Sequence, residues 1–219
     1  MHPSAVDGYI FHIKKKNEAL VEKFGLAGRP VILSIARLST PEHKGQDRVL
    51  KALPRVLEKV PNAIYLIVGS GNDERVDEVL GEHPELRKSV ILAGPAPDNE
   101  RVDYYNLGDV YVLPSKFEGF GIVFIESLAC GVPVVASDAY GCREGLLGGD
   151  LGLLVPPDDL EAIADAIVEI LGKNAPRTLY DREYLRERTL GVYGIDAWNE
   201  RVKALVGLLR TPSLIDTSK

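Results

Sequence analysis

Residues 114–137 read PSKFEGFGIVFIESLACGVPVVAS and join a glycine-rich turn, an apolar helix and a strand. The helix is expected from about residue 121 to residue 130, and Glu126 is the one charge within it. Glu118 stands eight positions earlier, just before the helix. An ionised carboxylate on so apolar a helix needs partners, which are either a cation of the protein or hydroxyl groups of a ligand. The stretch therefore predicts a helix–strand unit and a carboxylate whose partners lie elsewhere.

Short apolar runs rich in β-branched residues recur on both sides of this stretch. Each run is nearly continuous in apolar residues, which is typical of parallel strands buried on both faces. Helical patterns fill the gaps between the runs. The sequence therefore predicts an α/β fold with a single Rossmann-like, doubly wound parallel sheet of about six strands and right-handed crossovers. The expected strands are residues 31–36, 63–68, 90–93, 110–114, 133–137 and 152–155.

Two of the expected helices carry boundary signals. Residues 45–60 place apolar side chains at helical spacing, and Pro54 lies inside the run, so a kink or a break is expected there. A later helix is expected to begin with a capping-box-like pair, Asp158 and Glu161, and to stop at Gly172.

Both ends of the chain depart from the alternation of strands and helices. Residues 1–30 carry mixed signals and are predicted to be a linker, whereas residues 31–175 form the α/β domain. Residues 176–210 have the pattern of extra C-terminal helices without a strand between them. Residues 211–219 are predicted to be a frayed tail.

Composition excludes several classes of protein. The chain has 219 residues and a formal net charge of −6, so it lacks the basic character of a nucleic-acid-binding protein. The basic run at residues 14–16 is interpreted as a solvated face. Two cysteines and four scattered histidines show no metal-ligand spacing, so no metal is assigned and a reduced, cytoplasmic protein is expected. The apolar stretches are too short to span a bilayer, and no signal peptide is recognised.

The segment IVGSGNDE, residues 67–74, contains part of a dinucleotide-binding fingerprint. Glu74 replaces the third glycine, which disfavours a nicotinamide-dependent dehydrogenase. A strand and the tight turn Gly69–Ser70–Gly71 remain. Such a turn at the carboxyl end of a parallel strand either lines a ligand crevice or serves the fold alone.

Two features of the sequence favour an anionic ligand. Arg37 and Lys44 lie on the loop after the first strand, where they either bind phosphate or are solvated surface cations. Gly119 and Gly121 allow close approach of the backbone, and the helix that follows presents free N–H groups to a phosphate. Glu126 would then bind hydroxyl groups of the same ligand.

These motifs together resemble the GT4-type retaining glycosyltransferases of the GT-B fold. The resemblance covers residues from about 30 to 172. It rests on the Arg and Lys of the first loop, on IVGSG and ILAG, and above all on residues 114–138, where Glu118 and Glu126 match the E-x7-E motif. It implies that the chain is half of a GT-B enzyme, namely the C-terminal Rossmann-like domain that binds the nucleotide sugar.

The resemblance also implies a role for each candidate residue. Arg37 and Lys44 would hold the donor's diphosphate as a leaving group, and Glu118 would contact the transferred sugar. Glu126 would bind both ribose hydroxyls. The other implied donor contacts are the backbone N–H groups of Phe120, Gly121 and Ile122 for sugar and phosphate, and Gly69, Gly71 and Ala96, the last within loop 94–98, around the base. No cofactor or metal ion is implied, because the two cations and the helix would stabilise the diphosphate.

The chain departs from the family pattern in several places. The acceptor-binding domain that comes first in such enzymes is missing, residues 4–11 only resemble the interdomain linker, and the family's glycine pair appears as Gly141–Cys142. The helices at 176–210 resemble the segment that crosses back toward the missing half.

The predicted function is therefore donor binding in a retaining hexosyltransferase that moves a sugar from a nucleoside diphosphate to an acceptor hydroxyl. The alternative is a stand-alone nucleotide-sugar-binding module, or the donor subunit of a split glycosyltransferase. The chain alone is expected to be inactive, and membrane-surface association of the parent enzyme stays open.

Overall fold

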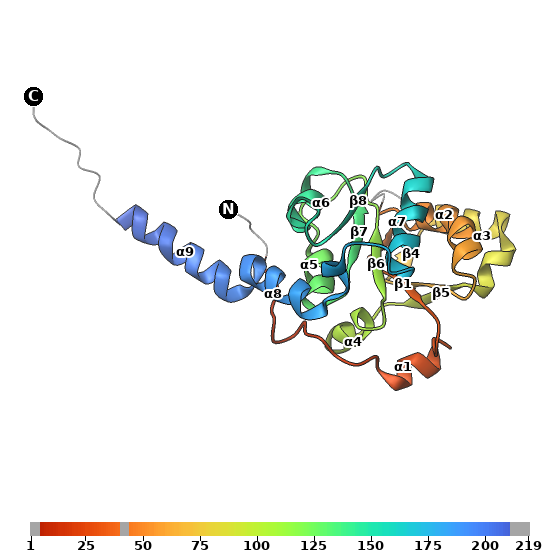
Figure 1. Ribbon diagram of the computed structural model, residues 1–219, viewed down its shortest axis with the longest axis horizontal. Coiled ribbons are helices and arrows are strands. Elements are labelled where there is room, and N and C mark those ends of the chain that lie inside the picture. Colours follow the sequence, from red (N-terminus) through yellow and green to blue (C-terminus); the bar gives the residue numbers. More distant parts are fainter. Residues whose placement is uncertain (1–4, 40–43, 211–219) are drawn as a thin grey trace, which may run out of the picture.

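A six-stranded parallel sheet forms the centre of the computed structural model, which describes residues 5–39 and 44–210 (Figure 1). The strand order is β5–β3–β1–β6–β7–β8. The predicted α/β fold, a Rossmann-like doubly wound sheet of about six strands, is confirmed. The sheet strands are β1 Val31–Ile35, β3 Ile64–Val68, β5 Val90–Gly94, β6 Val110–Leu113, β7 Val134–Ser137 and β8 Gly152–Val155, and a separate short pair joins β2 Leu38–Ser39 to β4 Gly71–Asn72.

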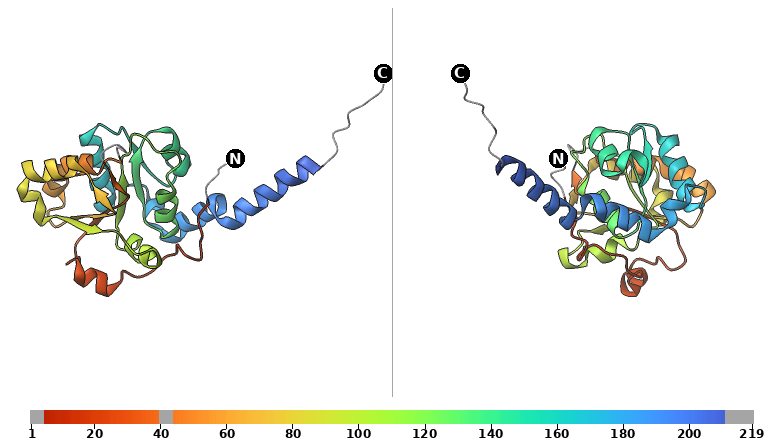
Figure 2. Two further views of the ribbon diagram at one scale, coloured as in Figure 1. Left: turned by 180° about the vertical axis from the view of Figure 1, so that it is seen from behind. Right: turned by 60° about the vertical axis from the view of Figure 1, so that its left-hand side comes forward.

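Helices cover both faces of the sheet. Helices α2, α3 and α7 lie on one face, and α5 and α8 lie on the other (Figures 1 and 2). Because both faces are covered, every residue of β1 and β3 is buried. The helices are α1 Glu18–Lys23, α2 Gln46–Lys59, α3 Glu74–Glu82, α4 Arg101–Tyr105, α5 Ile122–Ala129, α6 Tyr140–Gly145, α7 Leu160–Leu171, α8 Arg182–Tyr193 and α9 Ile195–Arg210.

Of the kink or break expected at Pro54, the break does not occur, because α2 continues through this residue. Pro54 lies on the exposed side of the helix, whereas Leu50, Leu53 and Val56 are fully buried. The packing of these apolar side chains on the sheet holds the helix in place before and after the proline, and it outweighs the lost backbone hydrogen bond.

The N-terminus of α7 also differs from the expectation. Its N-cap is Asp159, whose side chain accepts a hydrogen bond of 2.9 Å from the N–H of Ala162. Asp158 pairs instead with Arg48 at 3.1 Å and Lys116 at 2.8 Å. The two cations hold the Asp158 carboxylate away from the helix, so capping shifts by one residue.

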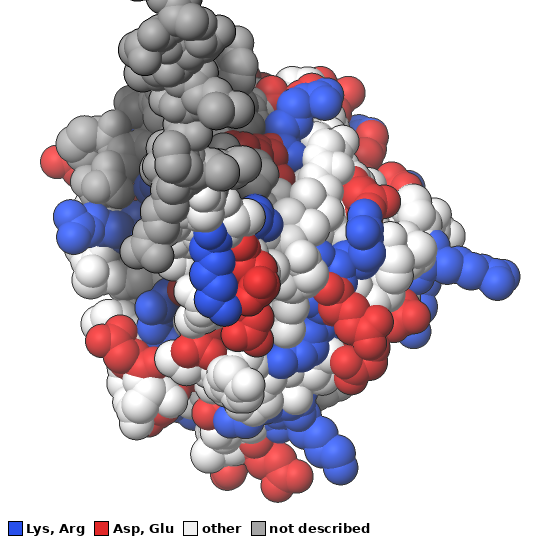
Figure 3. Space-filling model, turned by 90° about the vertical axis from the view of Figure 1, so that its left-hand side faces the viewer, with Lys and Arg blue, Asp and Glu red and all other residues white. Residues whose placement is uncertain are grey.

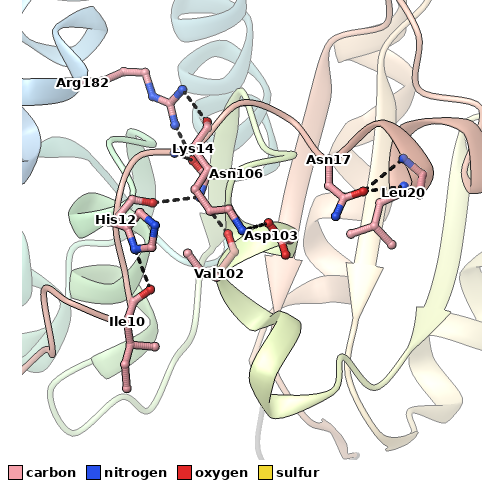
Figure 4. Close-up of polar contacts among 10 residues, drawn as sticks. Ile10, His12, Lys14, Asn17, Leu20, Val102, Asp103, Asn106 and Arg182 are labelled. Atoms are coloured by element: carbon pink, nitrogen blue, oxygen red, sulfur yellow. Dashed lines mark hydrogen bonds and ion pairs between the residues drawn. The ribbon is translucent and has the colours of Figure 1, made fainter.

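The segment before the sheet packs against the domain. The side chain of Asn106 accepts from the N–H of Lys14 at 2.8 Å and donates to the carbonyl of His12 at 3.0 Å (Figure 4). Asp109, just before β6, pairs with Lys16 and accepts from the N–H of Val31. At the other end of the described chain, α9 projects away from the body beyond α8 (Figure 2).

Candidate active site

The sheet reverses its strand order between β1 and β6. From β1 the chain moves outward to β3 and β5, and it then returns to place β6 on the other side of β1. In open parallel sheets, ligands bind at the carboxyl ends of the strands at such a point. A cavity of about 630 Å³ lies there. It is lined by Ala36, Arg37, Lys44, Leu113 and residues 118–123.

The cavity brings together residues that lie far apart in the sequence. Those predicted to contact diphosphate and sugar all line it, namely Arg37, Lys44, Glu118, Phe120, Gly121 and Ile122. Gly69, Gly71, Ala96 and Glu126 are not among its lining residues.

Helix α5 begins at the edge of this cavity. Its N-cap, Gly121, has φ +80°, a conformation that L side chains rarely adopt. A Cβ atom at this position would also lie 2.1 Å from the ring of Phe124. No side chain among the described residues caps the start of α5. Its first N–H groups and the positive end of its dipole are therefore available to an anion.

Lys44 and Glu118 form an ion pair in the cavity, with 3.1 Å between Nζ and Oε2. Both side chains are mostly shielded, with exposed fractions of 23% and 15%. Arg37 is exposed. The cavity thus holds one cation paired with an acid and a second cation that is open to solvent.

Glu126 lies deeper, on the buried side of α5, and is only 5% exposed. Its Oε2 atom accepts hydrogen bonds from the Arg101 guanidinium at 2.7 Å and from the Tyr105 hydroxyl at 2.6 Å. Burial raises the pKa of this carboxyl group, although both hydrogen bonds oppose the shift. The sequence left two kinds of partner possible for Glu126, a cation of the protein or hydroxyl groups of a ligand. In the structure, the partners are a cation of the protein and a tyrosine hydroxyl.

The sequence did not reveal Arg101 and Tyr105. They lie four residues apart on α4, a spacing that places both on one face of a helix. That spacing is a usable signal, but it does not say which distant residue the face contacts. The fold supplies the missing information by bringing both side chains within hydrogen-bond distance of Glu126 on α5.

The turn at residues 69–71 has a structural reason for its glycines. A Cβ atom on Gly69 would lie 1.9 Å from the carbonyl oxygen of Ala36, and one on Gly71 would lie 2.1 Å from that of Leu38. Both glycines let the loop after β3 approach the loop after β1, where β2 and β4 pair. Ala96 is partly buried in the loop that follows β5.

Gly141 lies close to the backbone of the loop that carries Glu118. A Cβ atom there would lie 2.4 Å from the carbonyl oxygens of both Glu118 and Gly119. Cys142 is buried and contacts the Ser137 hydroxyl at 3.2 Å. Because it has no side chain, Gly141 thus allows a close approach to the loop that carries Glu118.

Comparison with known proteins assigns this arrangement to a family. The sequence profile described as "Glycosyl transferases group 1" matches residues 16–188. The chain belongs to the group 1 glycosyltransferases. The resemblance inferred from the E-x7-E stretch is thereby confirmed at the level of the family.

This glycosyltransferase chain spans about half the length of the curated relatives it matches. It is 32% identical over 193 residues to the "GDP-mannose-dependent alpha-(1-6)-phosphatidylinositol monomannoside mannosyltransferase" of Mycolicibacterium smegmatis, an alignment that covers 83% of this chain and 47% of that one. Sucrose-phosphate synthase from Thermosynechococcus elongatus superposes with a TM-score of 0.78 at 28% identity, covering 94% of this chain and 51% of that one. The Anabaena protein HepE, solved with UDP and glucose, has a TM-score of 0.76 at 22% identity over 93% of this chain and 55% of that one. The fold is therefore half of a GT-B glycosyltransferase.

The glycosyltransferase chain has a second, larger hollow of about 970 Å³ at the amino ends of the strands. Some of its charged side chains serve the fold: Lys16 pairs with Asp109, and Arg182 donates to the side chain of Asn106 at 2.6 Å and to the carbonyl of Cys130 at 2.8 Å. The hollow also lies at the end of the sheet opposite the switch point. It is therefore not the candidate active site.

The surface charge of the glycosyltransferase chain is mixed on the face from which α9 projects. Lys and Arg alternate there with Asp and Glu, without a single-sign patch among the residues described on that face (Figure 3). Within the described ranges, no cluster of three or more His, Cys, Asp or Glu side chains could hold a metal ion. None of the described helices is long and apolar enough to cross a membrane.

Proposed function

We propose that this chain binds a nucleoside diphosphate sugar and is the donor half of a retaining glycosyltransferase that transfers a hexose to an acceptor hydroxyl. The observation that carries the proposal is the cavity at the switch point of the sheet. Two cations, a carboxylate and the uncapped start of α5 meet there. This combination suits a diphosphate joined to a sugar.

Arg37, Lys44 and the N–H groups at the start of α5 would hold the diphosphate. As the bond between sugar and phosphate breaks, negative charge grows on the diphosphate and the sugar gains oxocarbenium character. Lys44 and Glu118 form an ion pair with each other in the structure. A bound donor would draw Lys44 toward the phosphates and leave Glu118 to accept hydrogen bonds from the sugar hydroxyls.

Glu126 would bind the ribose. Both of its contacts with described residues use Oε2, which leaves Oε1 for the ribose hydroxyls. Arg101 and Tyr105 would keep the carboxylate in one orientation. The base would lie beside the Gly69–Gly71 turn and the loop around Ala96.

GDP-mannose is the first donor to test. Several relatives between 31% and 37% identical are named as mannosyltransferases, and some of these names specify GDP-mannose. HepE was solved with UDP, so UDP and UDP-glucose are the natural comparison. The acceptor-binding site would belong to the part of the enzyme that this chain does not span.

Calorimetry with GDP, UDP, ADP and GDP-mannose tests the proposal directly. One nucleoside diphosphate should bind, and Arg37→Gln should weaken that binding by about 1.5–3 kcal/mol, the range for a hydrogen bond to a charged group. The free nucleoside should bind wild type and variant alike. Arg87→Gln, an exposed arginine outside the cavity, is the matched control. Absence of binding by every diphosphate at millimolar concentration would refute the proposal.

A further inference from the structure

Phe11, in the segment before the sheet, contacts both residues that hold Glu126. Its ring packs edge-on against Tyr105, with 5.8 Å between ring centroids. The guanidinium of Arg101 lies over the same ring at 5.6 Å. Phe11 is only 8% exposed, so it shields these two partners from water on that side. The Arg101 side chain is 33% exposed, and the face of the Phe11 ring attracts its positive charge.

The two partners of Phe11 converge on one atom. Arg101 and Tyr105 each donate to Oε2 of Glu126. The Tyr105 side chain is fully buried, and its ring also packs on Tyr111 at 5.9 Å. A shift of the Phe11 ring would therefore move both donors, and with them the carboxylate.

The backbone around Phe11 is fixed by the same helix. Lys14 forms an ion pair with Asp103 of α4, and Asn106, directly after α4, binds the backbone of His12 and Lys14 (Figure 4). The side chain of Asn106 is further held by hydrogen bonds with Arg182 and with the carbonyl of Val102. The segment and α4 therefore form one unit.

An arginine of helix α8 connects this unit to the C-terminal end of α5 through hydrogen bonds. Arg186 donates to the carbonyls of Phe11 at 2.6 Å, Ala129 at 2.8 Å and Gly8 at 2.7 Å. Ala129 is the last residue of α5, whose carbonyls carry the negative end of the helix dipole. The N-terminal segment thus contacts the surroundings of Glu126 through α4 and shares an arginine with the C-terminus of α5.

We propose that Phe11 is a positioning residue of the nucleoside site, through which the N-terminal segment orients Glu126 toward the ribose. The inference rests on the proposed ribose role of Glu126. Phe11 itself touches no ligand. Its ring sets the positions of Arg101 and Tyr105. These two side chains in turn determine where Oε1 of Glu126 lies relative to the ribose.

The test compares, by calorimetry, the binding of a ribonucleoside diphosphate with the binding of its 2′-deoxy form. The pair is GDP and 2′-deoxy-GDP, or the corresponding pair with another base if the wild type binds that base instead. Phe11→Leu keeps most of the buried apolar volume but removes the aromatic face. Because one cation–π contact is lost, this variant should bind the ribonucleotide about 3- to 10-fold more weakly than the wild type. The ratio between its affinities for the ribonucleotide and the deoxyribonucleotide should also be smaller. Phe11→Tyr keeps the face and should retain the preference.

Phe24→Leu is the matched control. Phe24 also belongs to the N-terminal segment and packs on α4, but through Tyr104 at 6.1 Å, which has no described contact with Glu126. This variant should leave the ribose preference unchanged. Thermal unfolding of each variant checks the fold, and Phe11→Met replaces Phe11→Leu should the latter not fold.

The outcomes separate the two proposals. A wild type that binds GDP and its 2′-deoxy form equally overturns the ribose role of Glu126 and the inference with it. A wild type that prefers ribose, together with a folded Phe11→Leu that prefers it equally, overturns the role of Phe11 alone.

Discussion

At the scale of single residues, Glu126 shows how a buried charge is kept. Arg101 supplies a cation and Tyr105 a neutral donor, and both use the same carboxylate oxygen. Burial still dominates and raises the pKa of the carboxyl group. The desolvation of this carboxylate therefore costs more than its two partners return, as happens in buried ion pairs generally.

This raised pKa predicts a pH-dependent contribution to stability. Because the folded pKa lies above the unfolded one, the stability contribution of Glu126 is fully present below the ordinary pKa of Glu, and it is lost as pH rises through the raised value. Glu126→Gln removes this dependence. The unfolding free energy of the variant should therefore increase relative to that of the wild type as pH rises from about 4 to about 7. Urea unfolding across that range measures the difference. Glu78→Gln, an exposed acid, should not show the trend. A difference between Glu126→Gln and wild type that stays constant with pH would contradict the prediction.

At the scale of elements, the start of α5 depends on one backbone conformation. Gly121→Ala forces a side chain into a left-handed backbone and against Phe124, so it should destabilise the fold by about 1–3 kcal/mol and weaken diphosphate binding. Gly119→Ala is the matched control for stability, because nothing lies within 4 Å of its Cβ position. Chemical unfolding and calorimetry on both variants test this. Equal effects of the two substitutions would show that the turn has no special geometry.

Pro54 lies inside α2, where a proline is energetically unfavourable. The proline lacks the N–H that a continuous helix uses, and its ring lies on the exposed side. Pro54→Ala should stabilise the protein by about 1–2 kcal/mol, since the restored hydrogen bond exceeds the entropy that proline removes from the unfolded chain. Lys51→Ala, another exposed position of α2, should change stability little. Differential scanning calorimetry decides, and a lower melting temperature for Pro54→Ala would contradict the prediction.

At the scale of the whole molecule, the cavity at the switch point is open on one side. It opens to solvent beside Arg37 and Ile122, and such sites normally become competent when a second domain closes over them and excludes water. We therefore expect the purified chain to transfer no sugar to an acceptor alcohol. Adding the N-terminal half of a homologous enzyme in trans should restore transfer if the chain is a donor subunit. Robust transfer by the chain alone would overturn this expectation.

Much of the molecule could be predicted from the sequence because its signals are local. Continuous apolar runs located the strands of the sheet, and the EGFG turn located the cavity through Glu118 and Gly121. The contacts that were missed join distant segments: Lys44 with Glu118, and Arg101 with Glu126. Pairings of this kind depend on which loops and helices meet in space, which periodicity and propensity do not encode.

The short contact between Val6 and the end of α8 has a mechanical consequence. Val6 donates to the carbonyl of Tyr193 at 2.8 Å and accepts from the N–H of Ile195 at 3.2 Å. The backbone at residue 6 and the backbone at residues 193–195 thus meet at one point of the domain. A further domain attached through both of these segments would swing and twist about that point, but sliding past the donor half would break both hydrogen bonds at once. Opening and closing would then be rotations about this one point.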